Sequence, residues 1–121
     1  MVEKCNQETG RAGEELAAGY LSRRGFRIVE TNFRARGGEI DIVAREGETV
    51  VFVEVKTRSR REEISPRFSI TARKRSRIVK VAQQYLKKTG CPVYTTPVRF
   101  DVVTVELGAG EVDHLPGAFR A

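Results

Sequence analysis

Two charged residues, Glu54 and Lys56, interrupt the apolar run VVFVEVK at residues 50–56. An almost continuous apolar run is typical of a central strand covered on both faces, and side chains alternate along a strand, so both charges should point the same way. In the preceding run, EIDIV at residues 39–43, Asp41 and the first glutamate share a face opposite the two isoleucines. A tight hairpin between the two runs predicts that Asp41 lies close to Glu54 across the ladder.

Charges in such strands are unfavourable unless they are paired, hydrated or bound to a metal ion. Hard cations prefer carboxylate oxygens, so Asp41 and Glu54 are candidate ligands of Mg²⁺ or Mn²⁺, with the Val55 carbonyl as a further ligand. A metal ion held there can activate water, and Lys56 would orient or deprotonate that water or stabilise the transition state. The alternative is structural: an ion pair between Glu54 and Lys56 beside a solvated Asp41.

The elements that must position these residues form a predicted α/β domain. Apolar periodicity predicts helices at residues 11–24 and 71–89, and strands at residues 26–31, 39–45, 49–57, 98–107 and, less clearly, 111–115. Residues 59–68 are predicted to be a polar loop. The apolar stripe of the second helix comprises Ile78, Val79, Ala82, Tyr85 and Leu86. The order α-β-β-β-α-β favours an α/β sandwich around a mixed sheet, as one domain at residues 11–121 after a flexible N-terminus at residues 1–10.

Positive charge is concentrated in one part of the sequence. The chain has 121 residues and a net charge of +6, yet twelve basic residues lie between Lys56 and Lys88 against only Glu62 and Glu63. A basic band of this kind indicates a polyanion-binding surface, and arginine, which leads within it, suits phosphate oxygens. A solvated basic helix face that binds nothing is the alternative.

Several other classes of function lack support in the sequence. Two cysteines exclude a disulfide scaffold, and His114 alone, which we expect at the surface or its rim, excludes a histidine-based zinc centre. Neither a phosphate-binding loop motif nor a dinucleotide fingerprint occurs. No apolar run is long enough to span a membrane, and the polar N-terminus does not read as a secretory signal, so we expect a cytoplasmic protein without a membrane partner.

At these residues the sequence resembles the YraN family of bacterial predicted endonucleases, whose wider relatives are the restriction-endonuclease-like nucleases and archaeal Holliday junction resolvases. The segments GEID at residues 38–41 and VFVEVKTR at residues 51–58 carry the resemblance most clearly. Further matching pieces are Gly13-Glu14, Asn32, Arg34, Lys74 and Arg99-Phe100-Asp101.

The resemblance implies a restriction-endonuclease-like αβββαβ core, a mixed sheet flanked by helices. It also implies that Asp41 and Glu54 are metal ligands, that Lys56 is the catalytic lysine and that Glu14 is a further candidate catalytic carboxylate; an exposed glutamate near the start of a helix is the alternative for Glu14. Glu39 ranks below Asp41 because it adjoins a glycine turn.

The resulting prediction is a Mg²⁺- or Mn²⁺-dependent endonuclease whose substrate is DNA in preference to the alternative, RNA, and which selects it by structure and not by sequence. Its substrates would be branched or single-stranded, and a homodimer would suit four-way junctions. The residues expected to bind nucleic acid are Arg58, Arg60, Arg61, Arg67, Arg73, Lys74 and Arg77. One alternative is a non-catalytic nucleic-acid-binding module with a vestigial carboxylate site, and another is an adaptor that docks on an acidic protein.

Overall fold

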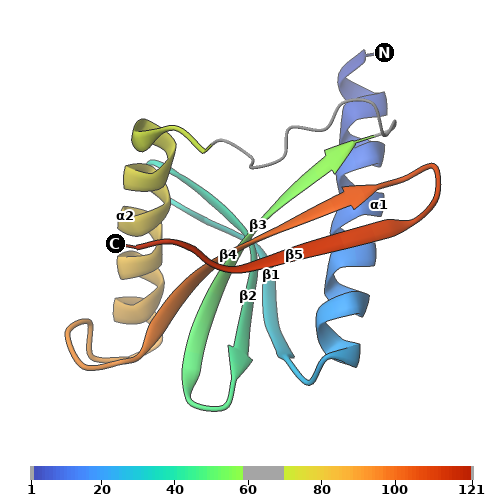
Figure 1. Cartoon of the computed structure of the whole chain (residues 1–121). Helices are drawn as coiled ribbons and strands as arrows, with labels where there is room; N and C mark the ends of the chain where they lie inside the picture. Colours follow the sequence, from blue (N-terminus) through green and yellow to red (C-terminus); the bar gives the residue numbers. More distant parts are fainter. Residues whose placement is uncertain (1, 59–69, 121) are drawn as a thin grey trace.

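The computed structural model describes residues 2–58 and 70–120 and contains two helices and five strands (Figure 1). The elements are, in chain order, α1 (Val2–Arg23), β1 (Arg27–Ala35), β2 (Gly38–Glu46), β3 (Thr49–Arg58), α2 (Ala72–Lys88), β4 (Val98–Glu106) and β5 (Glu111–Phe119). The predicted αβββαβ order is confirmed, and β5 is a full fifth strand.

The five strands form one mixed sheet in the order β1-β2-β3-β4-β5. β3 and β4 are parallel, and the connection between them contains α2; every other neighbouring pair is antiparallel. The three central strands are largely buried because helices cover the sheet on two sides, which explains the near-continuous apolar run of β3.

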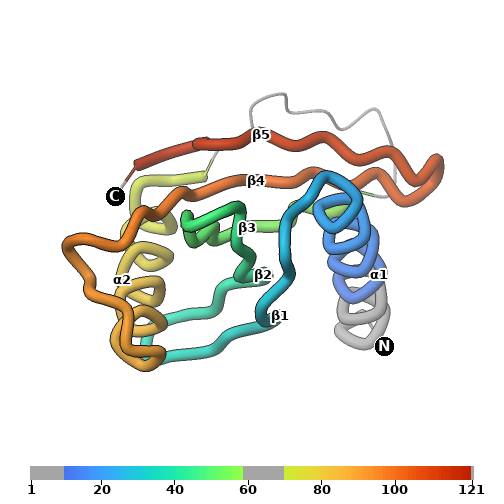
Figure 2. Tube along the Cα trace, turned by 90° about the horizontal axis from the view of Figure 1, so that it is seen from below, coloured from blue at the N-terminus to red at the C-terminus, as the bar shows by residue number. Residues whose placement is uncertain are grey.

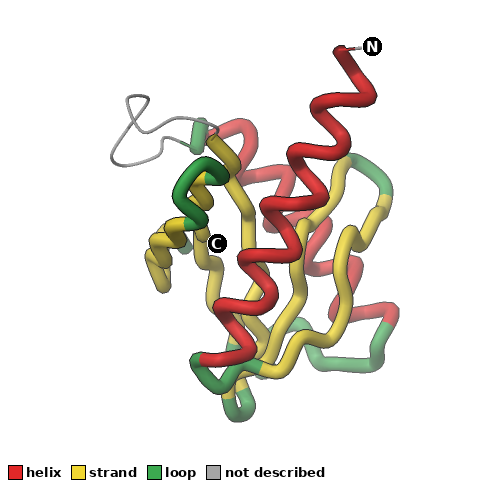
Figure 3. The backbone as a smooth tube through the Cα atoms, turned by 90° about the vertical axis from the view of Figure 1, so that its right-hand side faces the viewer, coloured by secondary structure: helices red, strands yellow, loops and turns green. Residues whose placement is uncertain are grey.

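The two helices lie on opposite sides of the sheet (Figures 2 and 3). A hydrophobic cluster lies beneath each of them. Ala17 and Leu21 of α1 pack on Val51, Val53 and the alternate residues of β4. The cluster beneath α2 contains Ile78, Val81, Ala82, Tyr85 and Leu86 of the helix together with Phe33, Ile40, Val43, Val50, Phe52 and Phe100 of the strands. The predicted stripe of α2 is therefore confirmed except that Val81 is buried and Val79 is only partly so. Neither α1 nor α2 is long and apolar enough to cross a bilayer.

Partway along the β1–β2 hairpin, the regular alternation of side chains between the two faces of the sheet is interrupted. The sequence did not predict this interruption. Ile40 packs beneath α2 whereas Ile42 packs beneath α1, so the two isoleucines do not share one face as expected. On either side of the change Phe33 pairs with Ile40 and Thr31 with Ile42, which places Asn32 opposite Asp41. Asn32 has a φ of +53°, a left-handed conformation that asparagine tolerates better than most residues. This conformation lets the hairpin turn from one helix towards the other.

Element boundaries differ from the prediction mainly at the N-terminus. α1 begins at Val2 and not at residue 11, so residues 2–10, expected to be a flexible tail, continue the helix. Residues 2–10 contain helix-compatible polar residues but no apolar stripe, and periodicity therefore gave no signal there. The predicted loop at residues 59–68 lies outside the described residues.

A glycine allows α1 to approach the end of β3. Gly13 is buried, and a methyl group added to its Cα would collide with the side chain of Thr57. Glu14, the next residue, thereby lies near the end of β3. Close contact of the helix backbone with the strand thus depends on the missing side chain at Gly13.

We expect Gly13→Ala to lower the free energy of unfolding by about 1–3 kcal/mol, because the added methyl group overpacks the helix–strand contact. Gly19 lies in the same helix, where an added methyl group meets only the flexible end of Arg23. Gly19→Ala should therefore stabilise the protein by about 0.5–1 kcal/mol through helix propensity. Urea denaturation of both variants measures the difference, and equal effects of the two changes would contradict the close approach.

Candidate metal centre

The site lies where β2 and β3 diverge. Their ladder pairs Ile42 with Val53 and then ends, so Asp41 and Glu54, next in register, are not joined by backbone hydrogen bonds. Instead the Val55 N–H donates a hydrogen bond of 2.8 Å to Oδ2 of Asp41. In Figure 1 the two strands separate above this point, β3 towards α1 and the β1–β2 hairpin towards α2. The Asp41 carboxylate therefore fills the opening of the sheet.

Three carboxylates from two elements meet at this opening. Glu14 of α1 and both Glu39 and Asp41 of β2 each offer an oxygen atom, and these atoms lie within 4.8 Å of one another. All three residues are half-buried. Glu39, ranked below Asp41 on sequence grounds, thus belongs to the group. Alternation along the strand had placed Glu39 on the face of Asp41, and its lower ranking depended only on the adjoining glycine turn.

The electrostatics of Asp41 show how closely the acidic groups are packed. Burial, followed by repulsion from Glu54, raises the pKa of Asp41 to about 7; the hydrogen bond from Val55 lowers it, while Glu14 and Glu39 raise it further. A carboxyl group that holds its proton to this pH lies among negative charges that a bound cation would compensate. The set of carboxylate oxygens matches the ligand preference of Mg²⁺ or Mn²⁺.

Glu54 also contacts a cation from α2. Nζ of Lys74 lies 2.7 Å from Oε2 of Glu54, and the glutamate side chain is only 12% exposed. Thr71 caps the helix by accepting a hydrogen bond from the Lys74 N–H, so the first turn of α2 is fixed beside the site. Lys56, two residues beyond Glu54 on β3, is exposed to solvent. The structure therefore places Lys74 in direct contact with a predicted metal ligand.

The remaining predicted basic residues divide into three groups. Arg58 ends β3 and is half-buried. Arg73 and Arg77 are exposed on α2. Arg60, Arg61 and Arg67 lie outside the described residues.

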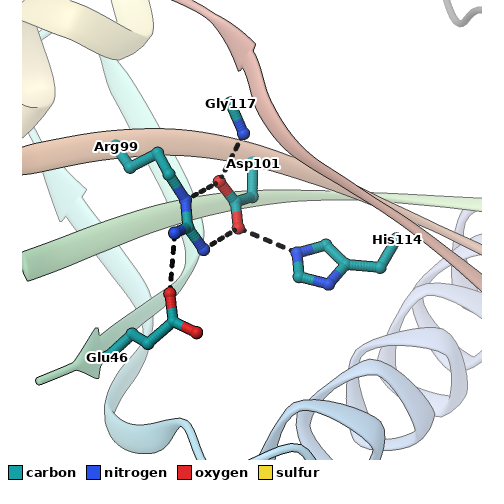
Figure 4. A network of polar contacts seen from close by, with 5 residues as sticks. All are labelled: Glu46, Arg99, Asp101, His114 and Gly117. Carbon is teal, nitrogen blue, oxygen red and sulfur yellow. Dashed lines mark hydrogen bonds and ion pairs between the residues drawn. The ribbon is translucent and has the colours of Figure 1, made fainter.

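Asp101, a fully buried aspartate, has electrostatic surroundings opposite to those of Asp41 (Figure 4). Asp101 of β4 is fully buried and accepts two hydrogen bonds of 2.8 Å from Arg99 and one of 2.9 Å from the Gly117 N–H. Nε2 of His114 lies 2.8 Å from its Oδ2, and the histidine side chain is 10% exposed, so the residue is half-buried at the rim and not on the open surface. Burial opposes the charge on Asp101, but the hydrogen bonds from Arg99, His114 and Gly117 lower its pKa below the usual value.

We expect Asp41→Asn to raise the free energy of unfolding of the metal-free protein by about 1–3 kcal/mol near pH 8. Above pH 4 the unfolded chain has released the Asp41 proton that the folded protein retains, so the stability linked to this proton is present below pH 4 and is lost as the pH rises through about 7. Urea denaturation in EDTA between pH 4 and 8 measures this change.

Asp101→Asn is the matched control and should act in the opposite direction. Asp101 has a lowered pKa, so its contribution is present above about pH 4 and is lost as the pH falls further. Removing its charge leaves Arg99 without its buried partner and should cost about 3 kcal/mol at pH 8. Destabilisation by Asp41→Asn similar to that by Asp101→Asn would contradict the electrostatic description of the cluster.

Comparison with known proteins identifies close relatives along nearly the whole chain. A 43% identical UPF0102 protein of Geobacter metallireducens aligns over 95% of this chain and 94% of its own length. A UPF0102 protein of Clostridioides difficile is 40% identical over 94% of this chain and 98% of its own. Among solved structures, Pyrococcus furiosus SfsA in complex with Ca²⁺ aligns over 92% of this chain at 17% identity and a TM-score of 0.37, and the chain spans 63% of that structure.

The family comparison agrees with these relatives. The family model described as "Uncharacterised protein family UPF0102" matches residues 13–105, from Gly13 of α1 to Val105 of β4. This range contains all the carboxylates of the site. The chain therefore belongs to the UPF0102 family, which is the YraN family that its motifs resemble.

Proposed function

We propose that the chain is a Mg²⁺- or Mn²⁺-dependent endonuclease that hydrolyses phosphodiester bonds in DNA. The observation that carries the proposal is the convergence of Glu14, Glu39 and Asp41 at the opening between β2 and β3, with Glu54 close enough to raise the pKa of Asp41. Such an arrangement is unfavourable in the folded protein unless the charges are paired, hydrated or bound to a cation, and a cation would compensate all of them at once. We infer that the chain acts in the cytoplasm, where Mg²⁺ is plentiful.

The carboxylates would hold the metal ion, which on binding activates water and neutralises charge at a phosphate. Asp41 is held in place by the Val55 N–H, so its second oxygen can face the ion, and the Val55 carbonyl is a further candidate ligand. Glu54 would release Lys74, and that lysine would then be available to a phosphate oxygen. Exposed Lys56 would orient the attacking water or stabilise charge at the phosphate as the bond breaks.

The basic residues support nucleic acid as the substrate. Exposed Arg73 and Arg77 on α2, together with Arg58 and with Arg60, Arg61 and Arg67 of the adjoining segment, would contact the phosphate backbone. Backbone contacts carry no sequence information, so we infer recognition of branched or single-stranded DNA by its structure. A two-fold dimer would suit a four-way junction.

The decisive experiment is cleavage of labelled four-way, flapped, single-stranded and duplex DNA in Mg²⁺ or Mn²⁺. We expect wild type to cut, and Asp41→Asn and Lys56→Ala to lower the rate by at least about 100-fold while still binding DNA. Both variants are purified in the same way as wild type, so a contaminating nuclease would cut equally in all three samples. Equal cutting by all three, or binding without cutting by wild type, would overturn the catalytic proposal.

Metal binding separates the enzyme from a non-catalytic nucleic-acid-binding module. We expect Glu54→Gln and Asp41→Asn each to weaken Mn²⁺ binding at least about tenfold in calorimetry, since each removes a charged ligand. Lys56→Ala should bind Mn²⁺ at least as well as wild type, because it removes a nearby positive charge. Wild type that binds DNA but no Mn²⁺ would favour the binding module.

DNA affinity should depend steeply on salt. We expect Arg73→Gln and Arg77→Gln each to reduce the slope of log affinity against log salt by about 1, because each removes one phosphate contact. Lys87→Gln, at the far end of α2, removes the same charge and should leave the slope nearly unchanged. Equal effects of all three changes would indicate a diffuse charge effect, and a slope near zero would favour an adaptor for an acidic protein.

A further inference from the structure

A pocket adjoins the carboxylate cluster on the side of α1. It has a volume of about 350 Å³ and is lined by Gly10, Arg11, Glu14, Asn32 and Arg34. Glu14 belongs both to the pocket and to the cluster. Arg34 links them as well, since its Nε lies 3.3 Å from Oε1 of Glu39. A molecule in the pocket would therefore lie next to any ion held by the carboxylates.

The lining of the pocket has the chemistry of an anion site with a polar neighbour. Arg11 and Arg34 bring two guanidinium groups, whose planar donors suit phosphate oxygens. The Arg34 side chain is 79% exposed, and its ion pair with Glu39 is long, so the guanidinium can reach a ligand at small cost. Asn32 contributes an amide that can both donate and accept hydrogen bonds.

The backbone is arranged to form this pocket. Asn32 takes its left-handed conformation at the position opposite Asp41, where the hairpin changes faces. Uncommon backbone conformations of this kind concentrate at binding sites. On the other wall Gly10 has no side chain, and a methyl group added there would meet no atom within 4 Å. The space beside α1 is therefore open at Gly10, without a neighbour that requires the glycine.

We propose that this pocket binds one unpaired nucleotide of the substrate strand, with Arg11 and Arg34 on its phosphate and the Asn32 amide on its sugar or base. The inference rests on the proposed nuclease function and specifies its substrate. The volume lies near the lower end of the roughly 300–1,000 Å³ range of small-molecule sites, which suits one nucleotide and not a segment of duplex. Because a paired base remains stacked in the helix, a nucleotide enters the pocket only from a single strand, a flap or an opened junction.

The test is a titration of the protein with thymidine 5′-monophosphate in Mg²⁺, followed by amide chemical shifts. We expect shifts at Gly10, Asn32 and Arg34, with thymidine and inorganic phosphate each binding at least about tenfold more weakly, since each lacks half of the contacts. Arg34→Gln should weaken binding at least about tenfold by loss of a phosphate contact. Arg27→Gln, the same change at the other end of β1, should bind as wild type does.

Two further variants distinguish an effect on nucleotide binding from an effect on folding or on metal binding. Gly10→Leu adds a bulky side chain to the wall of the pocket without removing a polar group, and should weaken binding of the nucleotide at least about tenfold while leaving Mn²⁺ binding intact. Asn32→Gly keeps the left-handed backbone accessible but removes the side-chain amide. It should weaken the binding of thymidine 5′-monophosphate more than the binding of inorganic phosphate.

The outcomes distinguish failure of this inference from failure of the nuclease proposal. Wild type that binds Mn²⁺ and cuts DNA but shows no nucleotide shifts at the pocket would overturn the pocket alone. Unchanged nucleotide binding by Gly10→Leu and Arg34→Gln would also overturn it. Nucleotide binding at the pocket without Mn²⁺ binding or cleavage would support the pocket and overturn the nuclease proposal.

Discussion

The hydrogen bond from the Val55 N–H to Asp41 is the constraint on which the site depends. At this point the β2–β3 ladder ends, and a side-chain carboxylate replaces the backbone carbonyl that would otherwise accept from Val55. The sheet can therefore open without leaving this donor unsatisfied. Opening turns Glu39 and the β1–β2 hairpin away from β3 and leaves space for Glu14. The same bond fixes one Asp41 oxygen and leaves the other available to a ligand.

The half-buried Asp41 and the fully buried Asp101 have opposite surroundings. Asp101 is surrounded by donors from β4 and β5, so its charge links these strands and the histidine that packs against Tyr20 and Phe26. Asp41 faces other carboxylates instead. Its raised pKa means that the charged form of this side chain destabilises the folded protein. The charge of Asp101 thus stabilises the fold, whereas the charge of Asp41 destabilises it, and local destabilisation of this kind is expected at a binding site.

Much of the fold could be predicted from the sequence because its elements have strong local signals. The apolar stripe of α2 and the buried run of β3 fix the helix, the central strand and the mixed sheet. The N-terminal half of α1 has no such stripe, and the length of β5 depends on pairing with β4, so neither could be read from local pattern. The contact of His114 with Asp101 joins residues on two strands, so local pattern gave no signal for it either.

The site was predictable in part. The pairing of β2 with β3 and the position of Asp41 beside Glu54 follow from the hairpin register, and they are confirmed as close electrostatic neighbours. Alternation along β2 placed Glu39 on the same face as Asp41, whereas the approach of Glu14 depends on the packing of α1 and could not be read from local pattern. The ion pair between Lys74 and Glu54 joins residues on different elements, and only the packing of α2 brings them together. Asn32 itself is a local signal of the change of face, because asparagine tolerates the left-handed backbone found there better than most residues do.

Fixing the first turn of α2 beside β3 has a consequence for both sides of the opening. The Thr71 cap and Lys74 belong to the same first turn of α2, and Lys74 contacts Glu54 of β3. The buried face of the same helix packs on Phe33, Ile40 and Val43 of the β1–β2 hairpin. A displacement of α2 along the sheet would therefore change the separation of Lys74 and Glu54 and the packing of the hairpin together, so the position of one helix is mechanically coupled to both sides of the opening.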